Sequence, residues 1–316
     1  MKKLLSLVLA LCMVLSCTSA LAAEKYEIGV LQLIQHAALD AATQGFKDAL
    51  IEKLGEDNVD IDVQNASGDT AACTQLADTF VSNDVDLIMA NATPALLAAM
   101  NATGDIPVLG TSITDYATAM GVTEGWTGVT GINVSGTSDL APLDAQAAMI
   151  KELFPDAKNV GLLYCSAEPN SVYQVTVIAG YLKDLGYETE EYAFADSNDV
   201  ASVTQNAADN CDVIYIPTDN TAASYTETIA NVVIPAKVPV IVGEAGICAG
   251  CGVATLSISY YDLGYQTGLM AYEILVNGAD VSTMAIQTAP NVTKMYNAAN
   301  VAELGLTMPA DYASIE

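Results

Sequence analysis

The chain has 316 residues and a formal net charge of −28, because 38 aspartate and glutamate residues face 10 basic residues, all of them lysine. This excess of acid argues against nucleic acid and anionic lipid surfaces as partners. The length suffices for two domains of roughly 100–200 residues each.

The first element in chain order is an export signal, which we place at residues 1–22. Two lysines precede the apolar run 4–15, which is too short to span a bilayer and leads to an A-x-A cleavage site ending at Ala22. Residues 14–17 also fit a lipobox, in which Cys17 would carry a lipid. Both alternatives predict an exported protein of the periplasm or the cell surface, either free or anchored through Cys17.

Strand-like and helix-like segments alternate from residue 26 onward, since short apolar runs bounded by turn residues are followed by segments with helical spacing of apolar residues. The first set has strands at 26–34, 59–64, 86–91 and 107–113 and helices at 37–54, 69–82 and 94–100. The second set has strands at 159–164, 187–194, 212–216, 239–242 and 253–259 and helices at 170–185, 200–210 and 220–236. Strands that alternate with helices form parallel sheets, so the pattern predicts an α/β protein with two such sheets.

Further segments are expected to connect the two sets. The Gly-, Thr- and Val-rich stretch 127–137 would cross to the second set, ahead of a helix at 139–154. The helix at 260–276 and the segment 284–290 would cross back and return before a last helix at 296–304. We therefore predict two Rossmann-like lobes with parallel sheets joined by a multi-strand hinge, with lobe 1 at 23–132 and 262–285 and lobe 2 at 133–261 and 286–316.

Polar, turn-forming clusters fall at the ends of the expected strands. In an open α/β sheet, ligands bind at the carboxyl ends of the strands. These clusters therefore predict a binding cleft between the lobes, and its candidate residues are His36, Thr93, Pro94, Thr111, Ser112, Asp115, Ser166, Asn170, Ser171, Thr218, Asp219, Asn220, Glu244 and Tyr260.

Several of these residues have an expected role. Thr93 as N-cap and Pro94 as first helical residue would leave backbone N–H groups free for a ligand carboxylate, without any arginine. Asp115 and Asp219 would hold a ligand ammonium group, and His36 would line the mouth of the cleft. Each could instead be an ordinary helix cap or loop residue, but the set together favours a binding site.

The residue types that catalysis needs are scarce. His36 is the only histidine, arginine is absent, and no P-loop, H-E-x-x-H or G-x-G-x-x-G motif occurs. Cys248 and Cys251 have C-x-x-C spacing but lack the second pair or nearby histidine of a zinc site, which favours a local disulfide or two free thiols. We therefore expect a binding protein without catalytic activity, cofactor or metal, whose partner is a small-molecule ligand.

The order and spacing of the strand-end motifs resemble a known family, the substrate-binding proteins of ABC transporters of the tryptophan/tyrosine type. The resemblance covers nearly the whole chain after the export signal and rests on His36–Asp40, Val63–Ala66, Ala92–Ala95, Asn170-Ser171, Pro217–Asn220 and Tyr260–Gly264. It implies a type I periplasmic-binding fold, delivery of a solute to an ABC permease, and an aromatic or other apolar amino acid as the ligand. The chain departs from the usual motifs in pocket-facing loops, at Ala37, Tyr116, Pro169 and Glu244-Ala245.

Two alternatives keep the same fold. A ligand-sensing domain would transmit its closure to a membrane signalling partner, and a sugar or nucleoside receptor would use the same cleft. Sugar clefts often pair arginine with stacked tryptophans, and this chain has no arginine and one tryptophan, so we rank that receptor lower.

Overall fold

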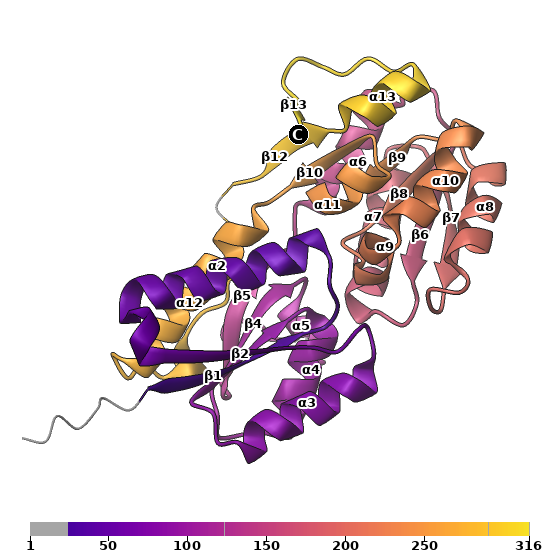
Figure 1. Ribbon diagram of the computed structural model, residues 1–316. Coiled ribbons are helices and arrows are strands. Elements are labelled where there is room, and N and C mark those ends of the chain that lie inside the picture. Colours follow the sequence, from indigo (N-terminus) through magenta and orange to yellow (C-terminus); the bar gives the residue numbers. More distant parts are fainter. Residues whose placement is uncertain (1–24, 123, 290, 316) are drawn as a thin grey trace, which may run out of the picture.

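A computed structural model describes residues 25–122, 124–289 and 291–315, and it consists of two α/β lobes (Figure 1). The export signal and Cys17 lie outside the described residues. Within the described residues, no helix combines the length and the apolar character needed to cross a membrane.

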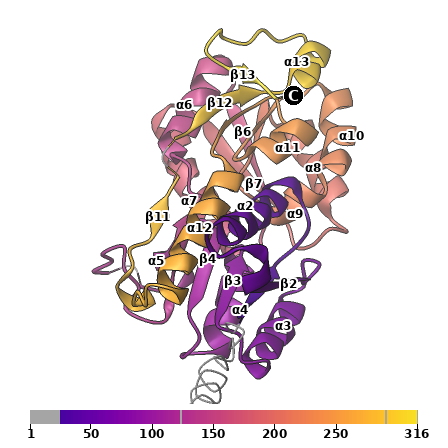
Figure 2. The ribbon, with the colours of Figure 1, turned by 60° about the vertical axis from the view of Figure 1, so that its left-hand side comes forward.

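Lobe 1 is built on a six-stranded sheet in the order β11-β5-β4-β3-β1-β2, in which every pair is parallel. The strands are β1 (Tyr26–Gln32), β2 (Val59–Asn65), β3 (Leu87–Asn91), β4 (Val108–Ile113), β5 (Val134–Ser138) and β11 (Gln287–Thr288). Its helices are α2 (Ala37–Leu54), η1 (Glu56–Asn58), α3 (Thr70–Ser82), α4 (Thr93–Ala102), α5 (Tyr116–Ala119), α12 (Tyr260–Leu275) and η2 (Val281–Thr283). Helices α2 and α12 cover one face of the sheet, and α3 and α4 cover the other (Figures 1 and 2).

Lobe 2 is built on a seven-stranded sheet in the order β13-β12-β10-β9-β8-β6-β7, in which only the β10–β12 pair is antiparallel among the described strands. The strands are β6 (Asn159–Cys165), β7 (Glu188–Phe194), β8 (Val213–Ile216), β9 (Val240–Val242), β10 (Ala254–Ser257), β12 (Thr293–Tyr296) and β13 (Ala313–Ser314). The helices are α6 (Leu143–Leu153), α7 (Pro169–Asp184), α8 (Val200–Asn210), α9 (Asn220–Ser224), α10 (Thr226–Ala236), α11 (Ala245–Gly250) and α13 (Ala298–Leu304). Together the two sheets confirm the predicted fold class, an α/β protein whose sheets are mainly parallel.

The chain passes from one lobe's elements to the other's between β5 and α6, between β10 and α12, and between β11 and β12. Helix α12 belongs firmly to lobe 1, because glycines let it lie directly on α2. A Cβ atom at Gly264 would come within 1.8 Å of the Ala42 carbonyl oxygen, and one at Gly45 within 2.1 Å of the Tyr261 carbonyl oxygen. The connection from β10 into α12 therefore ends on a helix that is closely packed within lobe 1.

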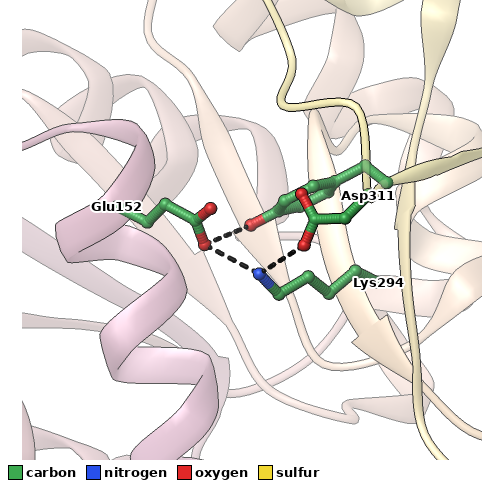
Figure 3. A network of polar contacts seen from close by, with 4 residues as sticks. Glu152, Lys294 and Asp311 are labelled. Atoms are coloured by element: carbon green, nitrogen blue, oxygen red, sulfur yellow. Dashed lines mark hydrogen bonds and ion pairs between the residues drawn. The ribbon is translucent and has the colours of Figure 1, made fainter.

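The last segment of the chain is fastened to lobe 2 by the polar network in Figure 3. The Lys294 ammonium lies 3.0 Å from a carboxylate oxygen of Glu152 on α6 and 3.0 Å from one of Asp311. The Tyr312 hydroxyl donates to Glu152 at 3.1 Å, and the Tyr312 ring lies 4.9 Å from the same ammonium. Solvent screens ion pairs as exposed as these, so the network stabilises the chain end only modestly.

Four predicted elements differ from the structure. The helix expected at 220–236 is divided into α9 and α10 at Tyr225, and the last helix starts at Ala298 because Thr293–Tyr296 forms β12. The helix expected from residue 139 starts at Leu143, since the residue before Pro142 is disfavoured in helical conformation. The end of the expected crossover is strand β5, which pairs with β4 in lobe 1.

The sheets also place two strands on the other side of the expected lobe boundaries. Strand β5 follows residue 133 and β11 follows residue 286, yet both pair within the lobe 1 sheet. The chain therefore passes into lobe 2 after Ser138 rather than near residue 132. Apart from these two strands, the predicted domain ranges stay a prediction.

Candidate functional site

The lobes face each other across three adjacent hollows at the carboxyl ends of their parallel strands, the position where ligands bind in open α/β sheets. The central hollow has an empty volume of about 280 Å³ and is lined by His36, Leu39, Ser112, Thr114, Asp139, Asn170, Thr218, Asp219, Asn220, Ala223, Glu244 and Tyr260. The wide hollow, of about 650 Å³, shares Asn220 with it, and the narrow hollow, of about 190 Å³, shares Asn170. Both lobes contribute to each hollow.

The structure brings eight of the fourteen predicted residues together around the central hollow: His36, Ser112, Asn170, Thr218, Asp219, Asn220, Glu244 and Tyr260. Thr93 and Asp115 line the narrow hollow, and Pro94 lines the wide one. Thr111, Ser166 and Ser171 line none of the three; Thr111 bonds Thr137, Ser166 bonds the Phe194 carbonyl, and Ser171 bonds Asp219. Asp115 and Asp219, expected to share one ammonium group, thus lie in different hollows.

Two acids from lobe 2 reach the central hollow as helix caps. Asp219 caps α9 by accepting from the Ala222 amide at 2.8 Å and also accepts from the Cys165 amide at 2.6 Å. Glu244 caps α11 by accepting from the Gly246 and Ile247 amides. Burial raises the pKa of both carboxyl groups to about 7, and the nearby Glu168 carboxylate adds to the effect on Asp219.

A third acid, Asp139, was missed among the predicted site residues because it was expected to begin a helix. It instead follows β5 in the connection to α6, where it accepts from the Tyr260 hydroxyl at 2.7 Å and from the Thr114 hydroxyl at 3.2 Å. Burial raises its pKa. Because no lysine lines the three hollows and the chain has no arginine, these three buried acids make the central hollow favourable for a cation.

Glu168, also missed, organises the loops behind these acids. It is 5% exposed and its carboxylate accepts five hydrogen bonds, from the Asn220 amide and side chain, the Thr221 amide and hydroxyl, and the Asn170 side chain. It lies within the polar loop 166–171 that drew attention to Ser166 and Ser171. A buried carboxylate with this many donors fixes the start of α9 against the start of α7.

Lobe 1 presents hydroxyl groups to the hollows. Thr93 is the first residue of α4 and not its N-cap, because Ala92 holds that position with φ 89°. The expected capping role of Thr93 is therefore wrong, and its Oγ1 is buried without a hydrogen-bond partner among the described residues. Ser112 Oγ is likewise buried without a hydrogen-bond partner among the described residues, and the Ser112 backbone has φ 57°. Non-glycine residues at positive φ are strained, and such strain gathers at ligand-binding positions.

Side chains from the two lobes are in direct contact at this site. His36 Nε2 lies 3.2 Å from Asn220 Oδ1, Gln174 Nε2 donates to Thr114 Oγ1 at 3.5 Å, and Ser224 Oγ donates to the Gln35 carbonyl at 3.5 Å. Each of these bonds links a residue of lobe 1 with one of lobe 2. The lobes are therefore closed upon each other around the central hollow.

The described residues contain no group of three His, Cys, Asp or Glu side chains that could hold a metal ion. Cys248 lies on α11 and Cys251 directly after it, and both are buried free thiols. Of the two alternatives, a local disulfide or two free thiols, the structure has the second. Burial raises the pKa of both thiols, so they are poorly reactive there.

Comparison with known proteins gives a consistent family. The family model of ABC transporter substrate binding proteins matches residues 27–313. A tyrosine-binding protein of Clostridioides difficile (strain R20291) is 38% identical over 263 residues, which are 83% of this chain and 75% of that protein.

Two solved structures differ in an informative way. A domain from Streptococcus pneumoniae in complex with L-Trp is 32% identical, with a TM-score of 0.88 over 93% of this chain and 100% of its own. The ligand-free, open structure of a substrate-binding protein with adhesive properties from Clostridium difficile is 35% identical, with a TM-score of 0.69 over 92% of this chain and 99% of its own. The whole chain thus superimposes better on the ligand-bound structure than on the open, ligand-free one.

Proposed function

Since the chain belongs to the family of ABC transporter substrate-binding proteins, we propose that it captures a free amino acid between its lobes and delivers it to an ABC permease outside the cytoplasm. The observation that carries this proposal is the contrast between the two sides of the site. Buried acids line the central hollow from lobe 2 and from the β5–α6 connection. From lobe 1 come two buried hydroxyls without partners among the described residues, that of Ser112 at the central hollow and that of Thr93 at the adjoining narrow hollow. A zwitterion matches such a site, because one end of it is cationic and the other accepts hydrogen bonds.

The orientation of the ligand follows from this contrast. Its ammonium group would donate to Asp219 and Glu244. Asp139, whose oxygens already accept from the Thr114 and Tyr260 hydroxyls, would add to the acidic character of the same lining, which contains no basic side chain other than His36. Its carboxylate would accept from the hydroxyls of Ser112 and Thr93 and from the amides at the start of α4, where a helix N-terminus favours an anion. Charge-assisted hydrogen bonds of this kind are roughly twice as strong as bonds between neutral groups.

An aromatic or other apolar side chain is the best match for the rest of the site. The wide hollow next to the central one is partly lined by Leu33, Ile34 and Tyr225. An apolar group buried there would gain about 25 cal/mol per Å² of covered surface. Aromatic amino acids are also the ligands named for two of the relatives, L-Trp and tyrosine.

A thermal-shift and calorimetric screen of ligand-stripped protein tests the proposal. L-tyrosine, L-tryptophan and L-leucine should raise the melting temperature by several degrees at about 100 times their dissociation constants, where binding adds about 2.7 kcal/mol. Tyramine, which lacks the carboxylate, and 3-(4-hydroxyphenyl)propionate, which lacks the ammonium group, serve as matched controls and should bind at least tenfold more weakly. Binding of sugars or nucleosides alone would overturn the proposal.

A further inference from the structure

His36 connects the two lobes through a chain of hydrogen bonds whose directions can be assigned. Asn220 Nδ2 lies 2.6 Å from Glu168 Oε2, and the five donors around that carboxylate leave it as an acceptor only. The amide nitrogen of Asn220 therefore points to Glu168, and its oxygen points to His36. Because an amide oxygen can only accept, His36 Nε2 must carry the proton of the bond that joins the lobes.

This assignment determines what the other ring nitrogen can do. Burial lowers the pKa of His36, which favours the neutral ring with one N–H. With that N–H at Nε2, Nδ1 is a hydrogen-bond acceptor. Nδ1 is buried without a partner among the described residues, and His36 lines the central hollow together with Asp219 and Glu244.

We propose that His36 is a specificity-determining residue, whose Nε2–H holds the lobes together on Asn220 while its Nδ1 accepts an N–H of the ligand's ammonium group. An ammonium group has three N–H donors, and Asp219, Glu244 and Nδ1 of His36 are three acceptors that line one hollow. The hollow thereby selects a primary ammonium over an N-alkylated one. The Glu168–Asn220–His36 chain acts as a positioning device, because it holds the histidine in the tautomer that accepts. This inference rests on the proposed amino-acid ligand.

The single histidine makes the tautomer directly observable. In a tag-free chain labelled with 15N-histidine, the complex with the amino acid that binds best in the screen should show a protonated Nε2 and an unprotonated Nδ1, because the lobes are closed there and Asn220 is in contact. Compared with the complex of the N,N-dimethyl derivative, the Nδ1 resonance should lie in the direction of an accepted hydrogen bond. The opposite tautomer, or the same Nδ1 resonance in both complexes, would overturn the inference.

Two variants separate the roles of the ring nitrogens. His36→Gln can keep the donor near the Nε2 position but loses the Nδ1 acceptor, whereas His36→Asn keeps an acceptor near Nδ1 but does not reach Asn220. The wild type should prefer the amino acid over its N,N-dimethyl derivative. His36→Gln should reduce this preference at least tenfold, because the loss of one hydrogen bond to a charged group usually costs that much or more. His36→Asn should weaken both ligands while keeping the preference.

The outcomes are distinguishable from failure of the proposed function. If no amino acid binds the wild type, the proposed function is wrong and the inference falls with it. If the wild type binds but both variants weaken the two ligands by equal factors, His36 only joins the lobes. The NMR experiment requires no substitution, so it decides the matter even if a variant does not fold.

Discussion

The two faces of the site differ in how their polar groups are held. On the lobe 2 face, Asp219 and Glu244 already bind backbone amides of their own lobe. On the lobe 1 face, Thr93 Oγ1 and Ser112 Oγ are buried without partners among the described residues. The polar groups of the lobe 2 face thus have protein partners, whereas those of the lobe 1 face would gain partners from the proposed ligand. Substitutions in lobe 2 should therefore cost both stability and affinity, and those in lobe 1 should cost affinity alone.

The largest loss of stability should come from Glu168→Ala in lobe 2. The change removes a buried carboxylate and leaves the Asn220 and Thr221 amides unsatisfied, so we expect a loss of about 3–5 kcal/mol in the free energy of unfolding. Urea denaturation measures it. Glu191→Ala, on the exposed part of β7, is a control that should cost much less. Equal midpoints for the two variants would show that Glu168 is not the organiser of these loops.

Asp219→Asn should weaken binding of the amino acid at least tenfold, because a buried charge partner of the ammonium is lost and such losses cost roughly 2–5 kcal/mol. The melting temperature should fall as well, since the new amide group can satisfy only one of the two backbone amides that the carboxylate binds. Calorimetry and thermal unfolding of the same sample give both values. Unchanged affinity would place the ammonium elsewhere.

The stability of the folded protein should depend on pH because of two acids of lobe 2. Asp219 and Glu244 have pKa values raised by burial to about 7, from 3.8 and 4.5. The folded, ligand-free protein therefore binds more protons than the unfolded chain between about pH 4 and 7. Their contribution to stability is full below about pH 4 and is lost as the pH rises through 7, by at most about 1.4 kcal/mol per pH unit for each group.

Glu244→Gln isolates this contribution. Melting temperatures of the variant and the wild type, measured without ligand from pH 4 to 8, should diverge in the direction of a relatively more stable variant as the pH rises. Affinity for the ammonium should rise over the same range in the wild type, because the acids become charged. If the difference in melting temperature between Glu244→Gln and the wild type does not change with pH, the raised pKa of Glu244 is contradicted.

Thr93→Val should give the smallest effect, a loss of about 1 kcal/mol in binding, or roughly fivefold in affinity, with unchanged or slightly higher stability. The substitution preserves shape and removes a buried hydroxyl that has no partner among the described residues. Thr204→Val on α8 is a matched control, since Thr204 Oγ1 is also buried without a described partner but lies outside the three hollows. Equal affinities of Thr93→Val and Thr204→Val for the amino acid would show that the Thr93 hydroxyl does not contact the ligand.

The sequence predicted the α/β architecture well, because the alternation of short apolar runs with helical spacing depends only on local periodicity. It also located residues such as Asp219 and Asn220, since strand ends gather at one edge of a parallel sheet. It missed Asp139 because a residue in a connection was expected to start a helix, and it chose Ser166 over Glu168 because nothing local indicates which side chain of a loop turns toward another helix. Contacts such as His36–Asn220 depend on how the lobes face each other.

The hydrogen bond between Tyr260 and Asp139 has a consequence for the order of events in binding. It ties together two of the connections between the lobes, β5 to α6 and β10 to α12, at the lining of the central hollow. Points near the axis of a hinge move least, so these groups can meet a ligand while the lobes are still apart. His36 follows β1, three strands from β5 in the sheet, and would meet Asn220 only at the end of closure. We therefore expect Asp139 and Tyr260 to govern the association rate and the His36–Asn220 bond to govern the dissociation rate.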